Sequence, residues 1–392
     1  MNNINESNKR TTASKILIAF TTTIFLILLI LLHILSFSVS NQLPKNSEYR
    51  RSINSNGISF VMYENFRDIS KSDVISISSE LLPQKLENIF NYSEIKPVLV
   101  NENFFDLNNI FVGGSKITKT MIENKTKAIV ISQNLALKLT LSGQSIGKTI
   151  KIQNNDFTIV GIYKSSDDFL SKISSDMYDR VYLPYTSNDE YEDIPIDVFS
   201  TTANSNSEKT LILMGIKNNE GMGYFYEDNA AKSNVIKNMP MLLYSFIMLF
   251  IVVLILKFLY KFTKSTIIHF KEKNEETYLL STIKINWKWC VSRTIGIFGG
   301  LLVSIVMVLH LPFKFIIFQK YIPNDNIFDI EFYKSVFIND MQRKNSYISA
   351  GNNFYCNLYD NAFIVSVFFA VVILILLLIV MYLKNLKPKN GY

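Results

Sequence analysis

The chain has 392 residues, of which 48% are hydrophobic, and its mean hydropathy is positive. This composition argues against a wholly water-soluble protein and predicts a membrane protein. The formal net charge of +7 does not indicate nucleic-acid binding, because much of the excess lies in short segments beside apolar runs, where membrane topology accounts for it.

Four apolar runs have about the length that a helix needs to cross roughly 30 Å of hydrocarbon. They predict membrane spans at 16–38, 241–260, 294–312 and 362–383. The first run could instead be a signal peptide, but its apolar core is longer than such peptides have and it lacks a clear small-residue cleavage site. We therefore interpret it as an uncleaved membrane anchor.

Lysine and arginine residues gather outside these runs, in the segments 1–15, 261–293 and 384–392. By the positive-inside rule these segments are cytoplasmic, and both termini are predicted inside the cell. Residues 39–240 then form an outer domain and residues 313–361 an outer loop, and Cys290 inside cannot pair with Cys356 outside. The predicted fold class is an α+β membrane protein with four transmembrane helices, one and then three, and a mixed α/β extracytoplasmic domain between helices 1 and 2.

Most of the outer domain has short sequence patterns, some typical of strands and some of helices. Residues 57–66 and 210–216 are rich in apolar residues and predict strands. Residues 72–90 predict helical stretches that are broken around Pro83.

The segment 127–164 has the clearest pattern in the domain. Its first apolar run, 128–131, predicts a buried strand, and Ser132 is a suitable N-cap for a helix through about Leu141. The buried face of this helix is predicted to consist of Leu135, Ala136 and Leu139. Gly143 then ends the helix, and alternating apolar residues from Thr149, a turn at 154–156 and the run 157–163 predict a β-hairpin.

The letters Gly143-Gln-Ser-Ile-Gly147-Lys148-Thr149 are similar to a phosphate-binding loop. That motif needs four residues between its first glycine and its Gly-Lys pair. It also needs a strand before the loop and a helix after it. Here three residues intervene, a predicted helix precedes and a predicted strand follows, so we interpret the stretch as a structural turn. No other catalytic motif or metal-ligand spacing is visible, and we predict that the chain is not an enzyme and holds no cofactor and no metal.

This segment resembles the extracytoplasmic domain of MacB-like permeases, the membrane subunits of ABC transporters that share the FtsX-type transmembrane module. The residues that carry the resemblance are Ala128–Ile131, Leu135-Ala136, Ile146–Ile150, Phe157–Ile162 and Val181–Pro184. The order of one span, a large outer domain and three further spans is also similar to the family. The resemblance implies a bacterial plasma-membrane protein that pairs with a second permease copy or paralogue. It further implies that ATP is hydrolysed by a separate cytoplasmic ABC ATPase subunit, and that the client is an extracytoplasmic peptide, a lipoprotein or a protein.

The resemblance also implies that the cytoplasmic segment 261–293 contacts the ATPase. Its residues 276–285 keep the acid and the apolar stripe of the family's coupling sequence, although Tyr278 and Lys284 stand where the family has glycine. Independently, Leu280, Ile283 and Trp287 predict a short amphipathic helix, which could dock into a partner's groove or lie on membrane lipid. The candidate coupling residues are Glu275, Glu276, Leu279, Leu280 and Ile283.

Small residues recur every four positions in the third predicted span, at Gly296, Gly300 and Ser304. Such a face lets another helix approach closely. The approaching helix is either another span of the same chain, which we favour, or a span of a second permease subunit. Two functions without an ATPase also stay open: a membrane-anchored sensor or scaffold, and an immunity protein that sequesters a toxic peptide.

Overall fold

The computed structural model describes the chain in two compact units. The helical unit comprises Met1–His33, Lys237–Phe315 and Val367–Tyr392, and the sheet unit comprises Ile34–Ile236 and Ile316–Ser366. The residues described are those other than 1, 53–54, 68–73, 87–92, 141–142, 177, 203–204, 217–222, 275–277, 315–321, 324–325, 348–353 and 386–392.

Four of the described helices are long and apolar enough to cross a membrane. They are α1 (Asn2–Gln42), α8 (Asn229–Asn274), α10 (Trp287–Leu309) and α12 (Phe354–Asn385). The candidate membrane spans within them are Ala19–Gln42, Asn229–Glu272, Trp287–Leu309 and Phe354–Ile379, each of which contains a strongly apolar window. This confirms the predicted class of a membrane protein with one span, a domain and three spans.

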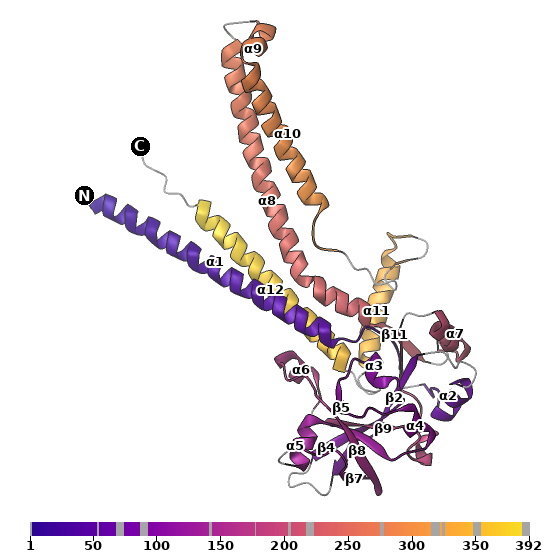
Figure 1. The fold of residues 1–392 in the computed structure, drawn as a ribbon. Coiled ribbons are helices and arrows are strands. Elements are labelled where there is room, and N and C mark those ends of the chain that lie inside the picture. Colours follow the sequence, from indigo (N-terminus) through magenta and orange to yellow (C-terminus); the bar gives the residue numbers. More distant parts are fainter. Residues whose placement is uncertain are drawn as a thin grey trace. The chain divides into compact units, whose positions relative to one another are not determined.

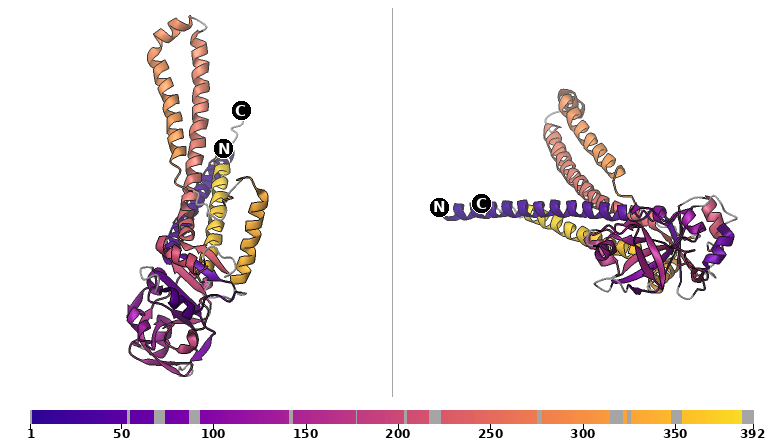
Figure 2. Two further views of the ribbon diagram at one scale, coloured as in Figure 1. Left: turned by 90° about the vertical axis from the view of Figure 1, so that its right-hand side faces the viewer. Right: turned by 60° about the horizontal axis from the view of Figure 1, so that its bottom comes forward.

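Within the helical unit, α10 runs beside α8, and the short helix α9 (Leu279–Ile285) joins them (Figures 1 and 2). A separate buried cluster brings together Leu32 of α1, Leu243 of α8 and Ile373 of α12. Each of these three leucine or isoleucine side chains is at most 1% exposed, so the cluster packs as tightly as a soluble core.

The sheet unit is built on an eleven-stranded mixed sheet with the strand order β11-β1-β10-β2-β4-β9-β6-β8-β5, to which β3 adds beside β4 and β7 beside β8. The strands are β1 (Ser47–Arg51), β2 (Ile75–Glu80), β3 (Gln84–Leu86), β4 (Ser93–Val100), β5 (Val112–Gly114), β6 (Ala128–Ser132), β7 (Thr149–Ile152), β8 (Asn155–Tyr163), β9 (Asp179–Pro184), β10 (Val198–Thr201) and β11 (Tyr224–Asp228). The pairs β4–β9 and β6–β8 are parallel, and the other pairs are antiparallel. The helices of this unit are α2 (Phe60–Arg67), α3 (Phe104–Leu107), α4 (Lys119–Glu123), α5 (Gln133–Leu139), α6 (Phe169–Ser174), α7 (Ser205–Leu213) and α11 (Ile330–Tyr347). Strands and helices in one domain confirm the predicted mixed α/β character.

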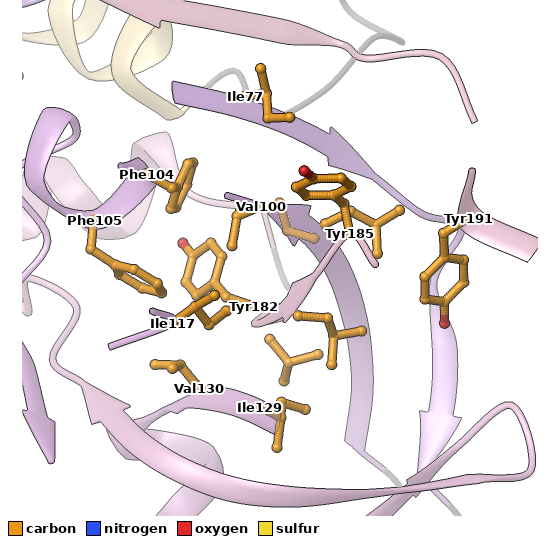
Figure 3. Packing of buried hydrophobic residues seen from close by; sticks show 14 of the residues in the cluster. Ile77, Val100, Phe104, Phe105, Ile117, Ile129, Val130, Tyr182, Tyr185 and Tyr191 are labelled. Atoms are coloured by element: carbon orange, nitrogen blue, oxygen red, sulfur yellow. The ribbon is translucent and has the colours of Figure 1, made fainter. Parts of the chain in front are cut away.

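Aromatic rings fill the centre of the sheet unit. The ring of Tyr182 on β9 lies 5.1 Å from that of Phe104, 5.4 Å from that of Phe105 and 5.1 Å from that of Tyr163, measured between centroids. Figure 3 shows Tyr182 near Phe104 and Phe105 and near Val130 of β6. Edge-to-face contacts of this kind add to the free energy that apolar burial contributes.

The local predictions for 127–164 are mostly confirmed. Ser132 caps α5, because its hydroxyl accepts a hydrogen bond from the Leu135 amide at 3.0 Å. Leu135 and Ala136 are buried, and Leu139 packs partly buried against the core. The hairpin turn is one residue earlier than predicted: Gln153 and Asn154 both have positive φ, as a two-residue turn requires, and Asn155 already belongs to β8.

Three predictions for the rest of the domain were wrong. Residues 57–66 contain helix α2, and residues 210–216 contain the end of α7. In both, buried side chains recur three positions apart, at Phe60 and Tyr63 and at Leu211 and Met214, which is the helical period. In the segment 72–90, the described residues 74–86 form strands β2 and β3 instead of helices, because Ile75 and Ile77 occupy alternate positions of a buried strand.

Gly161 of β8 is required by close packing. A Cβ atom at this position would overlap the carbonyl oxygen of Ser115 and lie 2.6 Å from Cγ1 of Val112. The Ser115 amide donates a hydrogen bond to the Val160 carbonyl at 2.9 Å, so this part of the backbone cannot withdraw without losing that bond.

We expect Gly161→Ala to lower the free energy of unfolding by about 1–3 kcal/mol through overpacking. Gly113→Ala is the matched control, because its added methyl group would lie 3.6 Å from the nearest atom, the carbonyl oxygen of Ile162. Urea unfolding of the full chain in detergent, followed by near-ultraviolet circular dichroism, measures both variants. Equal stability of the two variants would contradict the packing explanation.

Candidate functional site

Of the candidate coupling residues, Glu275 and Glu276 lie outside the described residues. The helix α9 begins at Leu279 and contains Ile283, which is exposed. Leu279 and Leu280 lie in its first turn, and only their backbone is described. A short helix is therefore present, but Trp287 does not extend it.

The predicted stripe from Leu280 to Trp287 is interrupted at Asn286. This residue has φ −106° and ψ 25°, so it ends α9 and precedes the first residue of α10. The apolar side chains before and after Asn286 consequently belong to two different helices. The stripe prediction failed because periodicity within a short window does not reveal a helix boundary.

The small residues of α10 face α8. A Cβ on Gly296 would lie 3.5 Å from the ring of Phe262, and a Cβ on Gly300 would lie 2.6 Å from Cδ2 of Leu259. Ser304 is buried, and its hydroxyl donates to the Gly300 carbonyl at 2.9 Å. Glycine at these positions therefore permits a close approach of two helices of one chain.

The stretch that is similar to a phosphate-binding loop has the hydrogen bonds of a structural turn. Gly147 has φ +86°, and its amide donates to the Ile159 carbonyl at 2.8 Å. The Lys148 amide donates to the Ser145 carbonyl at 3.1 Å, and the Ser145 amide donates to the Gly143 carbonyl. Amides that are used within the domain in this way are not directed at a phosphate.

The structure contains a second candidate site, which the sequence analysis did not predict, where the ends of four helices pack together beside the sheet. Residues of α1, α6, α8 and α12 form one buried apolar cluster in the sheet unit, which we call the junction. Its buried members are Val39, Leu43, Leu170, Ile236, Leu358 and Ala362. Three helices that contain apolar spans thus contribute their ends to one small core.

Asparagine side chains and backbone groups extend the junction toward the strands. The amide of Asn229, the first residue of α8, donates to the Asn46 carbonyl at 3.1 Å, and its side chain donates to the Asn46 side-chain oxygen at 2.9 Å. The Asn46 side chain in turn donates to the Leu107 carbonyl at 3.1 Å. On α12, the Tyr355 hydroxyl donates to the Asn108 carbonyl at 3.1 Å. The ends of α8 and α12 are therefore bonded to the segment around α3.

Four charged side chains lie beside these bonds. Glu48 of β1 is directly opposite Glu227 of β11 in the sheet. Arg50 pairs with Glu48 at 2.7 Å, with both side chains only 2% exposed, and Lys232 of α8 pairs with Glu227 at 2.7 Å. Two carboxylates that would repel each other are thus each neutralised by a cation, and one of the cations comes from a membrane helix.

The surroundings of Arg50 favour its ionised form. Burial opposes the charge of Arg50 and is the largest single effect, but Glu48, Cys356 and Glu227 together outweigh it and hold the pKa of Arg50 above its usual value. Lys232 also lies 3.6 Å from the sulfur of Cys356 on α12. The cation of α8 therefore touches both the sheet and another membrane helix.

One sequence signal could have indicated part of this cluster. Glu48 and Arg50 alternate with Tyr49, which places two opposite charges on one face of a strand. Lys232 gives no comparable signal. Its partner Glu227 is close in the sequence, but the two residues lie on either side of the boundary between β11 and α8, so no single period relates them, and Cys356 is far away in the sequence.

We expect Arg50→Met to lower the free energy of unfolding by about 3–5 kcal/mol, because Glu48 would stay buried and charged without its cation. Glu48→Gln combined with Arg50→Met should recover most of this loss, since no buried carboxylate is left at position 48. Urea unfolding, as for the glycine variants, measures the stability of both. If Arg50→Met is as stable as the parent chain, the ion pair of Arg50 and Glu48 does not stabilise the fold.

Comparisons with known proteins agree with the resemblance noted above. The family model of the MacB-like periplasmic core domain matches residues 16–214. No curated protein sequence matches the chain. Among solved structures, the periplasmic region of MacB from Actinobacillus actinomycetemcomitans is 13% identical, with a TM-score of 0.38, and the match covers 50% of this chain and 95% of that one.

A second solved structure is the extracellular domain of the noncanonic ABC-type transporter YknZ from Gram-positive bacteria. It is 13% identical, with a TM-score of 0.34, and the match covers 46% of this chain and 98% of that one. The family assignment rests on the family model, which spans more than half of the 392 residues. The chain belongs to the MacB-like permeases of ABC transporters and, with four apolar helices, is a multi-pass membrane protein.

Proposed function

We propose that this chain couples ATP hydrolysis on a separate cytoplasmic ATPase to movement of its sheet unit outside the cell. The observation that carries the proposal is the junction, in which α1, α8 and α12 each join an apolar span to a bonded contact with the sheet unit. If α8 shifts along its axis, the strands should move with it, because leaving them behind would separate Lys232 from Glu227, whose side chains are only 10% and 13% exposed.

The orientation in this proposal follows from the basic segments. Lysine and arginine are concentrated at the N-terminus, in 261–293 and after the last apolar stretch, which favours a cytoplasmic location for all three. The sheet unit then lies outside, and the description of the matching family model as a periplasmic core domain supports this orientation.

The helix α9 and the segment before it are the proposed contact with the ATPase. Glu275, Glu276, Leu279, Leu280 and Ile283 supply an acidic start and an apolar face for a helix that docks into a groove. ATP binds the partner subunit in this scheme. Two permease subunits act together, and the client is a peptide, a lipoprotein or another protein outside the membrane.

The ATPase contact is tested by copurification. With both Glu275→Lys and Glu276→Lys, we expect ATPase recovered with the chain from mild detergent to fall at least about tenfold, which a loss of about 1.4 kcal/mol in binding suffices to produce. Glu123→Lys, an exposed charge reversal on α4 of the sheet unit, is the matched control. If no ATPase copurifies with the parent chain, the proposed coupling to ATP hydrolysis fails, in favour of a role as a sensor, a scaffold or an immunity protein.

The orientation is tested by cysteine labelling in a chain that carries Cys290→Ser and Cys356→Ser. A membrane-impermeant maleimide should label Lys164→Cys, an exposed site of the sheet unit, on intact cells. Lys9→Cys should react only after the membrane is permeabilised, because the N-terminal segment is proposed to be cytoplasmic. The reverse pattern would refute this orientation.

A further inference from the structure

The helix α6 has two different faces. Leu170, Ser171 and Ser174 are buried, whereas Phe169 is 77% exposed and Ile173 is 54% exposed. Phe169 and Ile173 are four positions apart, so they lie on the same side of the helix. An aromatic ring and a branched aliphatic side chain are therefore presented together, away from the core of the sheet unit.

The buried face of α6 is bonded to the end of α1. Asp168, the N-cap of α6, accepts hydrogen bonds from the side chains of Gln42 and of Ser38, the latter at 3.4 Å. The hydroxyl of Ser171 donates to the side-chain oxygen of Gln42 at 2.7 Å. Partial burial opposes ionisation of Asp168, but these bonds and those from Ser171 and Ser166 lower its pKa, so it stays a carboxylate.

The same face also contacts α12. The side chain of Asn361 donates to the hydroxyl of Ser174 at 3.0 Å. Leu170 packs in the junction with Val39 of α1 and Ala362 of α12. The helix α6 is consequently held against two helices at once (Figure 1).

These contacts set the level of α6 relative to the spans. Ser38 and Gln42 form the last turn of the apolar stretch Ala19–Gln42, which is about 6 Å of helix. Phe37 of α1, which precedes Ser38, is exposed. Ile364 of α12, one turn after Asn361, is exposed as well. The exposed apolar residues of α6 are therefore carried by a helix that is bonded to the ends of two candidate spans, and both spans expose apolar side chains of their own near these bonds.

We propose that α6 is a membrane-surface anchor, with Phe169 and Ile173 inserted among the lipids at the boundary between headgroups and acyl chains. Aromatic and aliphatic side chains on a short helix beside a span are suited to this boundary. Lys172, exposed between them, is placed to reach lipid phosphate groups. In this proposal the anchor fixes the height of the sheet unit above the bilayer. The proposal requires only that α1 crosses the membrane, and it does not depend on which ATPase or client the protein uses.

Tryptophan fluorescence in lipid vesicles tests the anchor. The chain has two tryptophans, Trp287 and Trp289, which are replaced by phenylalanine in the full-length protein. Phe169→Trp or Ile173→Trp then supplies a single reporter. Ile146→Trp is the matched control, because Ile146 is also 54% exposed but lies in the turn before β7. Circular dichroism of each variant confirms that it is folded.

In vesicles of phosphatidylcholine and phosphatidylglycerol, we expect both α6 reporters to be quenched by lipids brominated near the headgroup end of the acyl chains. Their quenching constants for aqueous acrylamide should be several-fold lower than that of the Ile146→Trp control. An α6 reporter as accessible to acrylamide as the control would overturn the proposal. Protection from both quenchers would overturn it as well, because a protein would then cover this face.

Discussion

The balance of four charges, each at most 13% exposed, governs how α8 is attached to the sheet. Glu48 and Glu227 lie opposite each other on neighbouring strands, and the cations Arg50 and Lys232 neutralise them. In a medium of low dielectric constant an unpaired charge costs several kcal/mol, so separating any one partner is strongly unfavourable. Because Lys232 belongs to α8, the first turn of this helix and the strands β1 and β11 behave as one mechanical element.

The polar bonds around this cluster extend the attachment to the other helices. Asn46 and Asn229 tie α8 to the start of β1, and Tyr355 ties α12 to the end of α3. These groups are buried and bonded, so they specify one arrangement of the helix ends rather than a continuum. An ABC transporter permease that acts through an outer domain needs such a defined attachment, since a loose connection would dissipate the movement of the spans.

The anchor formed by α6 would complement this attachment. The junction carries force along the helices, whereas lipid insertion by Phe169 and Ile173 would resist vertical displacement of the domain at its edge. Movement of the sheet unit would then be a pivot about α6 rather than a uniform lift. The contacts of Asp168 with the last turn of α1 place that pivot beside the first span.

Local sequence patterns predicted the structure correctly where the residues that stabilise an element are close to one another in the sequence. The four candidate spans can be predicted from length and composition alone. The cap by Ser132 depends on the residue three positions later, and the hairpin after Thr149 depends on alternating apolar residues and a tight turn. The family resemblance was carried by the same segment. Patterns misled at 57–66 and 210–216, where short apolar runs have both helical and strand interpretations and packing against distant strands selects the helix.

The sequence by itself therefore determined the class of the protein, its spans and the central strand–helix–hairpin segment, because each rests on interactions between neighbours. Only the tertiary structure decided the junction. Arg50, Lys232 and Cys356 come from three distant parts of the chain. The pairing of β1 with β11 brings Arg50 and Lys232 to the same pair of strands, and the packing of α12 against α8 brings Cys356 to Lys232. No local periodicity encodes such a contact, because its free energy arises from burial that exists only after the chain has folded.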